Sequence, residues 1–131
     1  MNNDAEIQSI LKQTRSIAIV GISHKEERAS NKVAKFLMEK GYTVLPVNPK
    51  YQEVLGLPCY PSLEDIPVAV DMVDCFRRAE DILPLAESAI KIGAKVLWMQ
   101  LGIINEEAAA LAKEAGLQVV MDRCPKIEYR D

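Results

Sequence analysis

The sequence lacks several features that define common classes of protein, and each absence narrows its function. No apolar run approaches the ~20 residues that cross a bilayer, and the N-terminus has neither the basic region nor the apolar stretch of a signal peptide. The three cysteines are odd in number and have no paired spacing, which disfavours a disulfide framework and a zinc site. We therefore expect a cytoplasmic protein that contacts no membrane.

The chain also has no excess of basic charge and only one histidine. The net charge of -3 disfavours general binding to nucleic acid, because duplex binding requires a basic face. His24 is the only histidine, and no serine is paired with a base, so no hydrolytic triad is indicated. Asp71 and Asp74 lie on an apolar strand and are disfavoured as a catalytic dyad. The sequence therefore indicates a binding site more clearly than a reaction.

The apolar residues that are present alternate between two periodicities. The 131 residues are 49% hydrophobic, enough for one domain with a substantial core. Strands are predicted at 17–21, 43–47, 70–76, 95–99 and 117–121, with a short edge strand at 57–60. Helices are predicted at 4–13, from Ser30 as N-cap to Gly41, at 82–90 and from Asn105 to Gly116, with one helical turn at 62–66. This alternation predicts an α/β fold, a Rossmann-like doubly wound parallel sheet in which residues 1–131 form one domain.

The first predicted strand ends at Gly21 and runs into a polar loop that carries Lys25 and Arg28. A strand, a glycine turn and a helix N-terminus together form a phosphate site. The loop lacks the second and third glycines of G-x-G-x-x-G, and Val47-Asn48-Pro49-Lys50 after the second strand has no carboxylate to accept ribose hydroxyls. Both departures disfavour NAD. A phosphorylated ribose, as in NADP or coenzyme A, suits the lysine better.

Residues that follow the five strands gather at one edge of such a sheet, where ligands bind. In chain order these residues are Gly21, Ile22, Ser23, Lys25 and Arg28, then Asn48, Pro49 and Lys50, then Arg77 and Arg78, then Gln100, Leu101 and Gly102, then Asp122, Arg123 and Cys124. Their excess of cations within an acidic chain indicates an anionic ligand. Ser23 and backbone amides would hold a diphosphate while Lys25 or Arg28 meets a further phosphate. The alternative is that the loop cations are only solvated.

Two other residues allow a structural and a functional interpretation. Trp98 is favoured as a packed aromatic side chain over a stacking platform for a ligand. Cys124 lies near Arg123 and Lys126, cations that favour a reactive thiolate, although a structural thiol is the favoured interpretation.

Five segments, at residues 18–23 (with Arg28 and Ser30), 44–49, 73–78, 96–102 and 121–126, carry a family resemblance in order along nearly the whole chain. On these segments the chain resembles the small, single-domain members of the CoA-binding domain family. That family is related to the N-terminal Rossmann domain of succinyl-CoA ligase alpha subunits.

The resemblance implies coenzyme A, or an acyl-CoA, as the ligand. It implies a diphosphate site at Gly21, Ile22 and Ser23 with Lys25, Arg28 and Ser30 beside it, and an adenosine site at Val47, Asn48, Pro49 and Lys50. It implies a pantetheine path along the segments Phe76-Arg77 and Trp98-Met99-Gln100, with Gly102 as a further residue of the cofactor site. It assigns no catalytic residue and no metal ligand.

The chain departs from the ligase because it ends at Asp131, just after the predicted sheet, without a phosphohistidine domain. We therefore expect no ligase activity and a non-catalytic CoA-binding protein. One alternative is a small NADP-dependent oxidoreductase, for which Lys50 and Tyr51 are the only adjacent Lys-Tyr candidates. Another is a redox regulator in which Cys124 forms a mixed disulfide with the CoA thiol. The acyl group, a homodimer and an unidentified protein partner all remain open.

Overall fold

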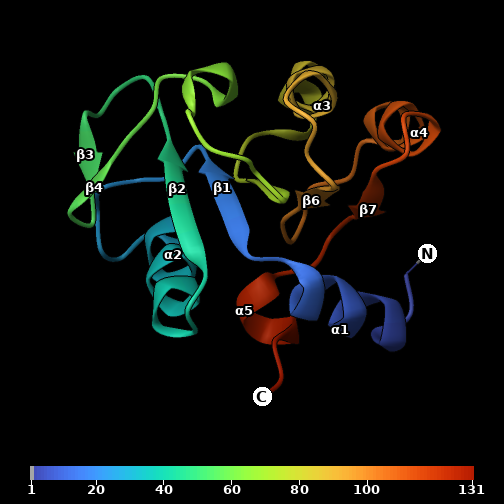
Figure 1. Ribbon diagram of the computed structural model, residues 1–131, viewed down its shortest axis with the longest axis horizontal. Coiled ribbons are helices and arrows are strands. Elements are labelled where there is room, and N and C mark those ends of the chain that lie inside the picture. The colour runs from blue at the N-terminus through green and yellow to red at the C-terminus, as the bar shows by residue number, and fades with distance from the viewer. Residues whose placement is uncertain (1) are drawn as a thin grey trace.

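The computed structural model describes residues 2–131 and is built around a five-stranded parallel sheet in the order β2-β1-β5-β6-β7 (Figure 1). The strands are β1 (Ser16–Val20), β2 (Thr43–Val47), β5 (Met72–Cys75), β6 (Val96–Met99) and β7 (Gln118–Val120). Each lies where the apolar runs predict a strand, and most ends differ by one or two residues. The predicted Rossmann-like α/β fold is confirmed.

Helices cover both faces of the sheet, which explains why the strands are apolar along their whole length. One face carries α3 (Ile82–Lys91) and α4 (Glu106–Glu114), and the other carries α1 (Asp4–Gln13), α2 (Ala29–Glu39) and the short α5 (Pro125–Glu128), as Figure 1 shows above and below the strands. Side chains of a strand alternate between these faces. In β1, Ala18 and Val20 pack towards α3 and α4, whereas Ile17 and Ile19 pack towards α1 and α2.

The helix ends follow the predicted capping in most places, with one correction. Asn105 caps α4 by accepting a hydrogen bond from the Ala108 amide at 2.9 Å, and Gly41 follows α2 with a φ of +93°. Ser30 was expected to cap α2, but the N-cap is Arg28, two residues earlier, and the helix begins at Ala29. The Ser30 hydroxyl instead accepts from the Ser23 amide at 2.9 Å, so this side chain ties the preceding loop to the helix.

Strand β2 lies at the sheet edge, as Pro46 within it suggests. The predicted edge strand at 57–60 is present in part, as the hairpin of β3 (Glu53–Val54) and β4 (Leu57–Pro58) followed by an isolated bridge from Tyr60 to Val47. The predicted turn near 62–66 is the 3₁₀ helix η1 (Leu63–Asp65), and a second one, η2 (Ala79–Asp81), precedes α3. The segment after the hairpin pairs with the carboxyl end of β2, through the bridge from Tyr60 to Val47. It therefore borders the region where the neighbouring strand β1 ends.

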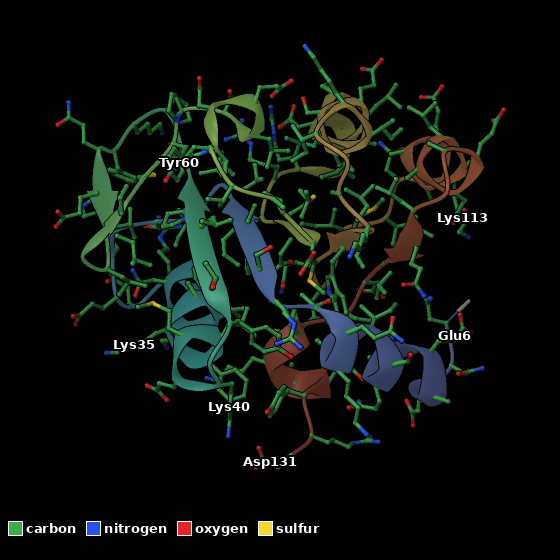
Figure 2. The ribbon with its side chains drawn as sticks, in the orientation of Figure 1. Glu6, Lys35, Lys40, Tyr60, Lys113 and Asp131 are labelled. Atoms are coloured by element: carbon green, nitrogen blue, oxygen red, sulfur yellow. The ribbon has the colours of Figure 1, made fainter. Side chains whose placement is uncertain are left out.

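The sequence did not predict α5, which packs the C-terminal segment against α1 and α2. The Gln8 side chain donates to the Glu128 carbonyl at 2.7 Å. Lys40, just after α2, lies 3.2 Å from Asp131, and Figure 2 shows both at the lower edge of the molecule. These contacts lie at the end of the sheet opposite to the carboxyl ends of the strands. Within residues 2–131, no helix is long and apolar enough to cross a membrane.

Candidate functional site

The strand order reverses between β1 and β5, and the chain segments that follow these two strands are in close contact. From β1 the chain passes through α2 to β2 on one side, whereas β5 lies on the other side. Ligands of open α/β sheets bind at the carboxyl end of such a switch point. Gly21 follows β1 with a φ of +87°, and a Cβ atom there would lie 2.4 Å from the Phe76 carbonyl oxygen. Only glycine allows this approach without a shift of the backbone.

Neighbouring elements fix the loop after Gly21. Ile22 is fully buried, and its carbonyl accepts from the Asn48 side chain at 2.8 Å. The Ser23 amide donates to the Ser30 hydroxyl at 2.9 Å, and the Ser23 carbonyl accepts from the Asn31 side chain at 2.9 Å. The loop is therefore tied to both β2 and α2. The sequence suggested that backbone amides near Ser23 would bind a phosphate. The Ser23 amide itself, however, already donates its hydrogen bond to Ser30.

Residues after β2 divide between a structural role and a cavity wall. Asn48 is buried, and besides its bond to the loop it accepts from the Lys50 amide at 2.9 Å. Val47 and Pro49 line a cavity of about 340 Å³, together with Gly21, Arg77 and residues of η1 and α3. The Lys50 side chain is exposed. This cavity lies where the sequence places the adenosine end of the ligand.

A larger cavity of about 960 Å³ opens at the same edge of the sheet, on the side of α2. Its walls come from four segments, and its lining residues are Ala29, Lys32 and Val33; Phe76, Arg77, Arg78 and Asp81; Gln100, Leu101 and Ile103; and Cys124, Lys126 and Ile127. Small-molecule sites occupy roughly 300–1,000 Å³, so this cavity is at the top of that range. Arg77 and Asp81 line both cavities, which are therefore adjacent.

A buried polar pair lies behind the wall of the large cavity. Asp74 is fully buried on β5, between Ile19 and Trp98 of the neighbouring strands. With the Gln100 amide nitrogen facing Asp74, it donates to both carboxylate oxygens at 3.0 and 3.1 Å. Burial raises the pKa of Asp74 well above its usual value. Because the two side chains bond one another, the Gln100 nitrogen is not available to a ligand.

Cations without an acidic partner lie at the carboxyl edge of the sheet, and three of them, Lys32, Arg77 and Lys126, line the large cavity. Among residues 2–131, the side chains of Lys25, Arg28, Lys32, Arg77 and Lys126 have no carboxylate within 4.0 Å, whereas Arg78 lies 3.4 Å from Asp81. Some other basic residues form ion pairs, for example Lys95 with Asp71 at 3.8 Å, whereas others, such as Lys12 and Arg15, also have no carboxylate within 4.0 Å among the described residues. The carboxyl edge therefore carries positive charge that the protein does not neutralise by ion pairing, which favours an anionic ligand.

Two residues predicted for the cofactor site, Trp98 and Gly102, do not line the large cavity. Trp98 is fully buried, and its indole N–H donates to the Arg123 carbonyl at 2.8 Å. The Gly102 amide donates to the Asp122 side chain at 2.7 Å. The first contact joins β6 itself to the loop after β7, and the second joins the loop after β6 to that same loop. The structure therefore brings Phe76, Arg77 and Gln100 to the cavity and leaves the Trp98 side chain inside the core.

Sequence reasoning missed the part of the cavity that comes from helices. Lys32 and Val33 lie on α2, and Lys126 and Ile127 lie on α5. Nothing in their local pattern distinguishes them from ordinary helix residues. Reading the residues after each strand did find Arg78, Leu101 and Cys124, which also line the cavity.

This sheet, with cavities at its switch point, defines a Rossmann-like domain. The chain belongs to the CoA binding domain family, whose model matches residues 15–130. The predicted resemblance is thus confirmed, and family membership supports coenzyme A as the ligand.

Individual relatives are consistent with this assignment. The chain is 41% identical to Uncharacterized protein YneT of Bacillus subtilis (strain 168) over 95% of its length and 93% of that protein. It is 33% identical to Acetate--CoA ligase (ADP-forming) I of Archaeoglobus fulgidus over 82% of its length, but spans only 17% of the ligase. A solved structure of a hypothetical protein from Pyrococcus horikoshii OT3 superposes with a TM-score of 0.94 at 49% identity, over 97% of this chain and 89% of that one.

Proposed function

We propose that this protein binds coenzyme A or an acyl-CoA at the carboxyl edge of its sheet and acts as a binding protein rather than as an enzyme. The observation that carries this proposal is the group of unpaired cations at the carboxyl edge of the sheet, beside two cavities at the switch point, in a chain with a net charge of -3. Coenzyme A combines phosphates with a long, weakly polar arm. Such a ligand requires both cations and an apolar channel.

The diphosphate would lie over the N-terminus of α2. Within residues 2–131, the amides of Ala29 and Ser30 in the first turn of this helix have no hydrogen-bond acceptor. The helix dipole adds positive potential at this end, and Lys25 and Arg28 lie on the loop that leads into it. The Ser23 amide already donates to Ser30, so the backbone donors to the diphosphate would be these two helix amides. The Ser23 hydroxyl, which accepts from the Lys25 amide, would donate its proton to the diphosphate as well.

The two ends of the ligand would then occupy the two cavities. The adenine ring would lie in the smaller cavity, which Val47 and Pro49 line. The exposed Lys50 follows Pro49 directly in the chain and would contact the ribose phosphate. The pantetheine arm would pass Phe76 and Arg77 into the larger cavity. In this arrangement Gly21 matters because its missing Cβ lets the ends of β1 and β5 meet beneath the diphosphate.

A binding role is favoured because the reactive groups near the large cavity are already engaged or buried. Asp74 is bonded to Gln100 behind the cavity wall. Cys75 is fully buried, and burial together with the nearby Asp74 carboxyl raises the pKa of its thiol. A buried, protonated thiol is a poor nucleophile. The ligase activity of the longer relatives is not part of the proposal, since this chain spans only 17% of the ligase.

Titration calorimetry with ligand-free protein tests the proposal. Coenzyme A, dephospho-CoA and NADP would be titrated in parallel. We expect coenzyme A to bind with one site per chain, and dephospho-CoA to bind more weakly because it lacks the ribose phosphate that faces the cations. Binding of NADP with no binding of coenzyme A would refute the proposal and favour the oxidoreductase alternative.

A redox role is a second candidate, because Cys124, although only 6% exposed, lines the cavity that would receive the thiol end of the ligand. The step is thiol–disulfide exchange with CoA disulfide. The Cys124 thiolate attacks one sulfur of CoA disulfide and forms a mixed disulfide with that CoA, while the S–S bond of CoA disulfide breaks and the other CoA leaves as a thiolate that takes a proton from water. Mass spectrometry of protein incubated with CoA disulfide would show one added CoA that is removed by dithiothreitol and absent in Cys124→Ser. Unmodified wild-type protein would exclude this role.

A further inference from the structure

We infer that the large cavity also binds the acyl chain of an acyl-CoA and selects an apolar acyl group over one that ends in a carboxylate. This inference rests on the proposed function and specifies its ligand. Three properties of the cavity carry it, namely its size, the state of its polar groups and the exposure of its apolar rim.

The cavity is larger than the arm of coenzyme A requires. At about 960 Å³ it has nearly three times the volume of the neighbouring cavity, which measures about 340 Å³. The arm would enter along Phe76 and Arg77. The same cavity is also lined by the apolar side chains of Leu101, Ile103 and Ile127. A thioester carried at the end of the arm would therefore have its acyl chain among these apolar side chains.

The buried polar groups of the cavity cannot satisfy a charged acyl end. Gln100 is the most deeply buried polar residue of the wall, 5% exposed, and its amide nitrogen already donates to Asp74. A carboxylate brought to this depth would lose its hydration without gaining a donor, which is costly. Four cations, Lys32, Arg77, Arg78 and Lys126, also line the cavity, and all four are exposed, in contrast to the buried Gln100. We assign these to the phosphates and the entrance.

The rim exposes apolar side chains that a ligand would cover. The described residues include four large hydrophobic side chains that are at least half exposed, at Val68, Leu101, Ile104 and Ile127. Leu101 and Ile127 line the cavity, with exposed fractions of 56% and 66%. An acyl chain that continues from the proposed CoA site would bury both. Burial of apolar surface is the general source of affinity for such chains.

The experiment compares coenzyme A with its acetyl, butyryl, hexanoyl and succinyl thioesters by calorimetry on the full chain. From acetyl-CoA to hexanoyl-CoA we expect Kd to fall by about two- to fourfold per added methylene, the upper value corresponding to the transfer free energy of a fully buried CH₂. Butyryl-CoA and succinyl-CoA have the same number of acyl carbons. We expect butyryl-CoA to bind at least about tenfold more tightly, because its chain end carries no charge to desolvate.

Substitutions on the rim localise the effect. The double variant Leu101→Ser and Ile127→Ser should reduce the ratio of Kd for acetyl-CoA to Kd for hexanoyl-CoA towards one. Both side chains are exposed, so the fold should tolerate the change. Val68→Ser is the matched control, since Val68 is 54% exposed and lies outside both cavities. It should keep the wild-type ratio.

The outcomes separate this inference from the proposed function. Absence of binding by every thioester and by coenzyme A itself would refute both. Tight binding of coenzyme A with a Kd that does not change with chain length would overturn only the inference. Tighter binding of succinyl-CoA than of butyryl-CoA would also overturn it, because the exposed cations would then determine acyl selection.

Discussion

Replacement of Gly21 by alanine should destabilise the protein more than the same change at any solvent-exposed glycine. A non-glycine residue at positive φ costs about 1–2 kcal/mol. At Gly21 the new methyl group would also lie 2.4 Å from the Phe76 carbonyl oxygen and 2.9 Å from Arg77 Cδ. The arginine chain can move, but the carbonyl belongs to the backbone beside β5, so the strand ends must separate.

The magnitude follows from adding this displacement to the conformational cost. Forcing an extra methyl group into a packed site costs about 1–3 kcal/mol. We therefore expect Gly21→Ala to lower the free energy of unfolding by about 2–5 kcal/mol, a large part of the ~5–15 kcal/mol of a typical domain. Gly41→Ala is the matched control. Its φ is +93°, and a Cβ there would meet nothing within 4 Å, so only the conformational cost applies.

Urea unfolding followed by circular dichroism would measure both variants, and calorimetry would measure their affinity for coenzyme A. The strand ends that separate in Gly21→Ala form the floor of the proposed diphosphate site, so its affinity should also fall, whereas Gly41→Ala should bind as the wild type does. If the two alanine variants lose the same stability, the contact between the ends of β1 and β5 does not matter and the reasoning is wrong.

Three further predictions concern charge, pH and thiol access. Arg28→Ala should weaken binding of coenzyme A by about 5- to 150-fold, the range for losing a charged hydrogen-bond partner, and unchanged affinity in calorimetry would mean that this cation is solvated. The raised pKa of buried Asp74 means that the folded state holds this proton more tightly than the unfolded state. Stability should therefore be fully present below the ordinary pKa of aspartate and fall as pH rises towards the raised value. Urea unfolding should show a weaker decline in Asp74→Asn, and equal profiles would contradict the assignment. Coenzyme A should slow alkylation of Cys124 by N-ethylmaleimide, as peptide mass spectrometry would show, whereas equal rates with and without ligand would place the thiol outside the bound arm.

The regular elements could be predicted from the sequence because their signals are local. The apolar run before Gly21 and the caps at Asn105 and Gly116 depend on a few neighbouring residues, and the structure has β1 and α4 close to the predicted positions. Ser30 shows where local reasoning fails. A serine before an amphipathic helix is a good cap, but here its hydroxyl binds the Ser23 amide, a contact that depends on how the loop folds back.

The composition of the site was predictable only in part, because it depends on strand order. The rule that ligands bind after parallel strands found Gly21, Arg77 and Gln100 without knowing which strands are neighbours. The contributions of α2 and α5 to the large cavity require the three-dimensional arrangement. The same is true of Asp74, whose amide partner lies on the segment after the adjacent strand. Trp98 fits the interpretation as a packed aromatic side chain, since it is fully buried.

The most direct test of the central claim is to follow backbone amide signals by ¹H–¹⁵N NMR while coenzyme A is added. The account predicts saturable shifts at Gly21, Ala29, Phe76 and Gln100, around the carboxyl ends of the strands. A basic surface at the opposite end of the sheet, with Lys12, Arg15 and Lys40, is an internal control that should not respond. Shifts confined to that opposite surface, or no shifts at millimolar coenzyme A, would contradict the claim.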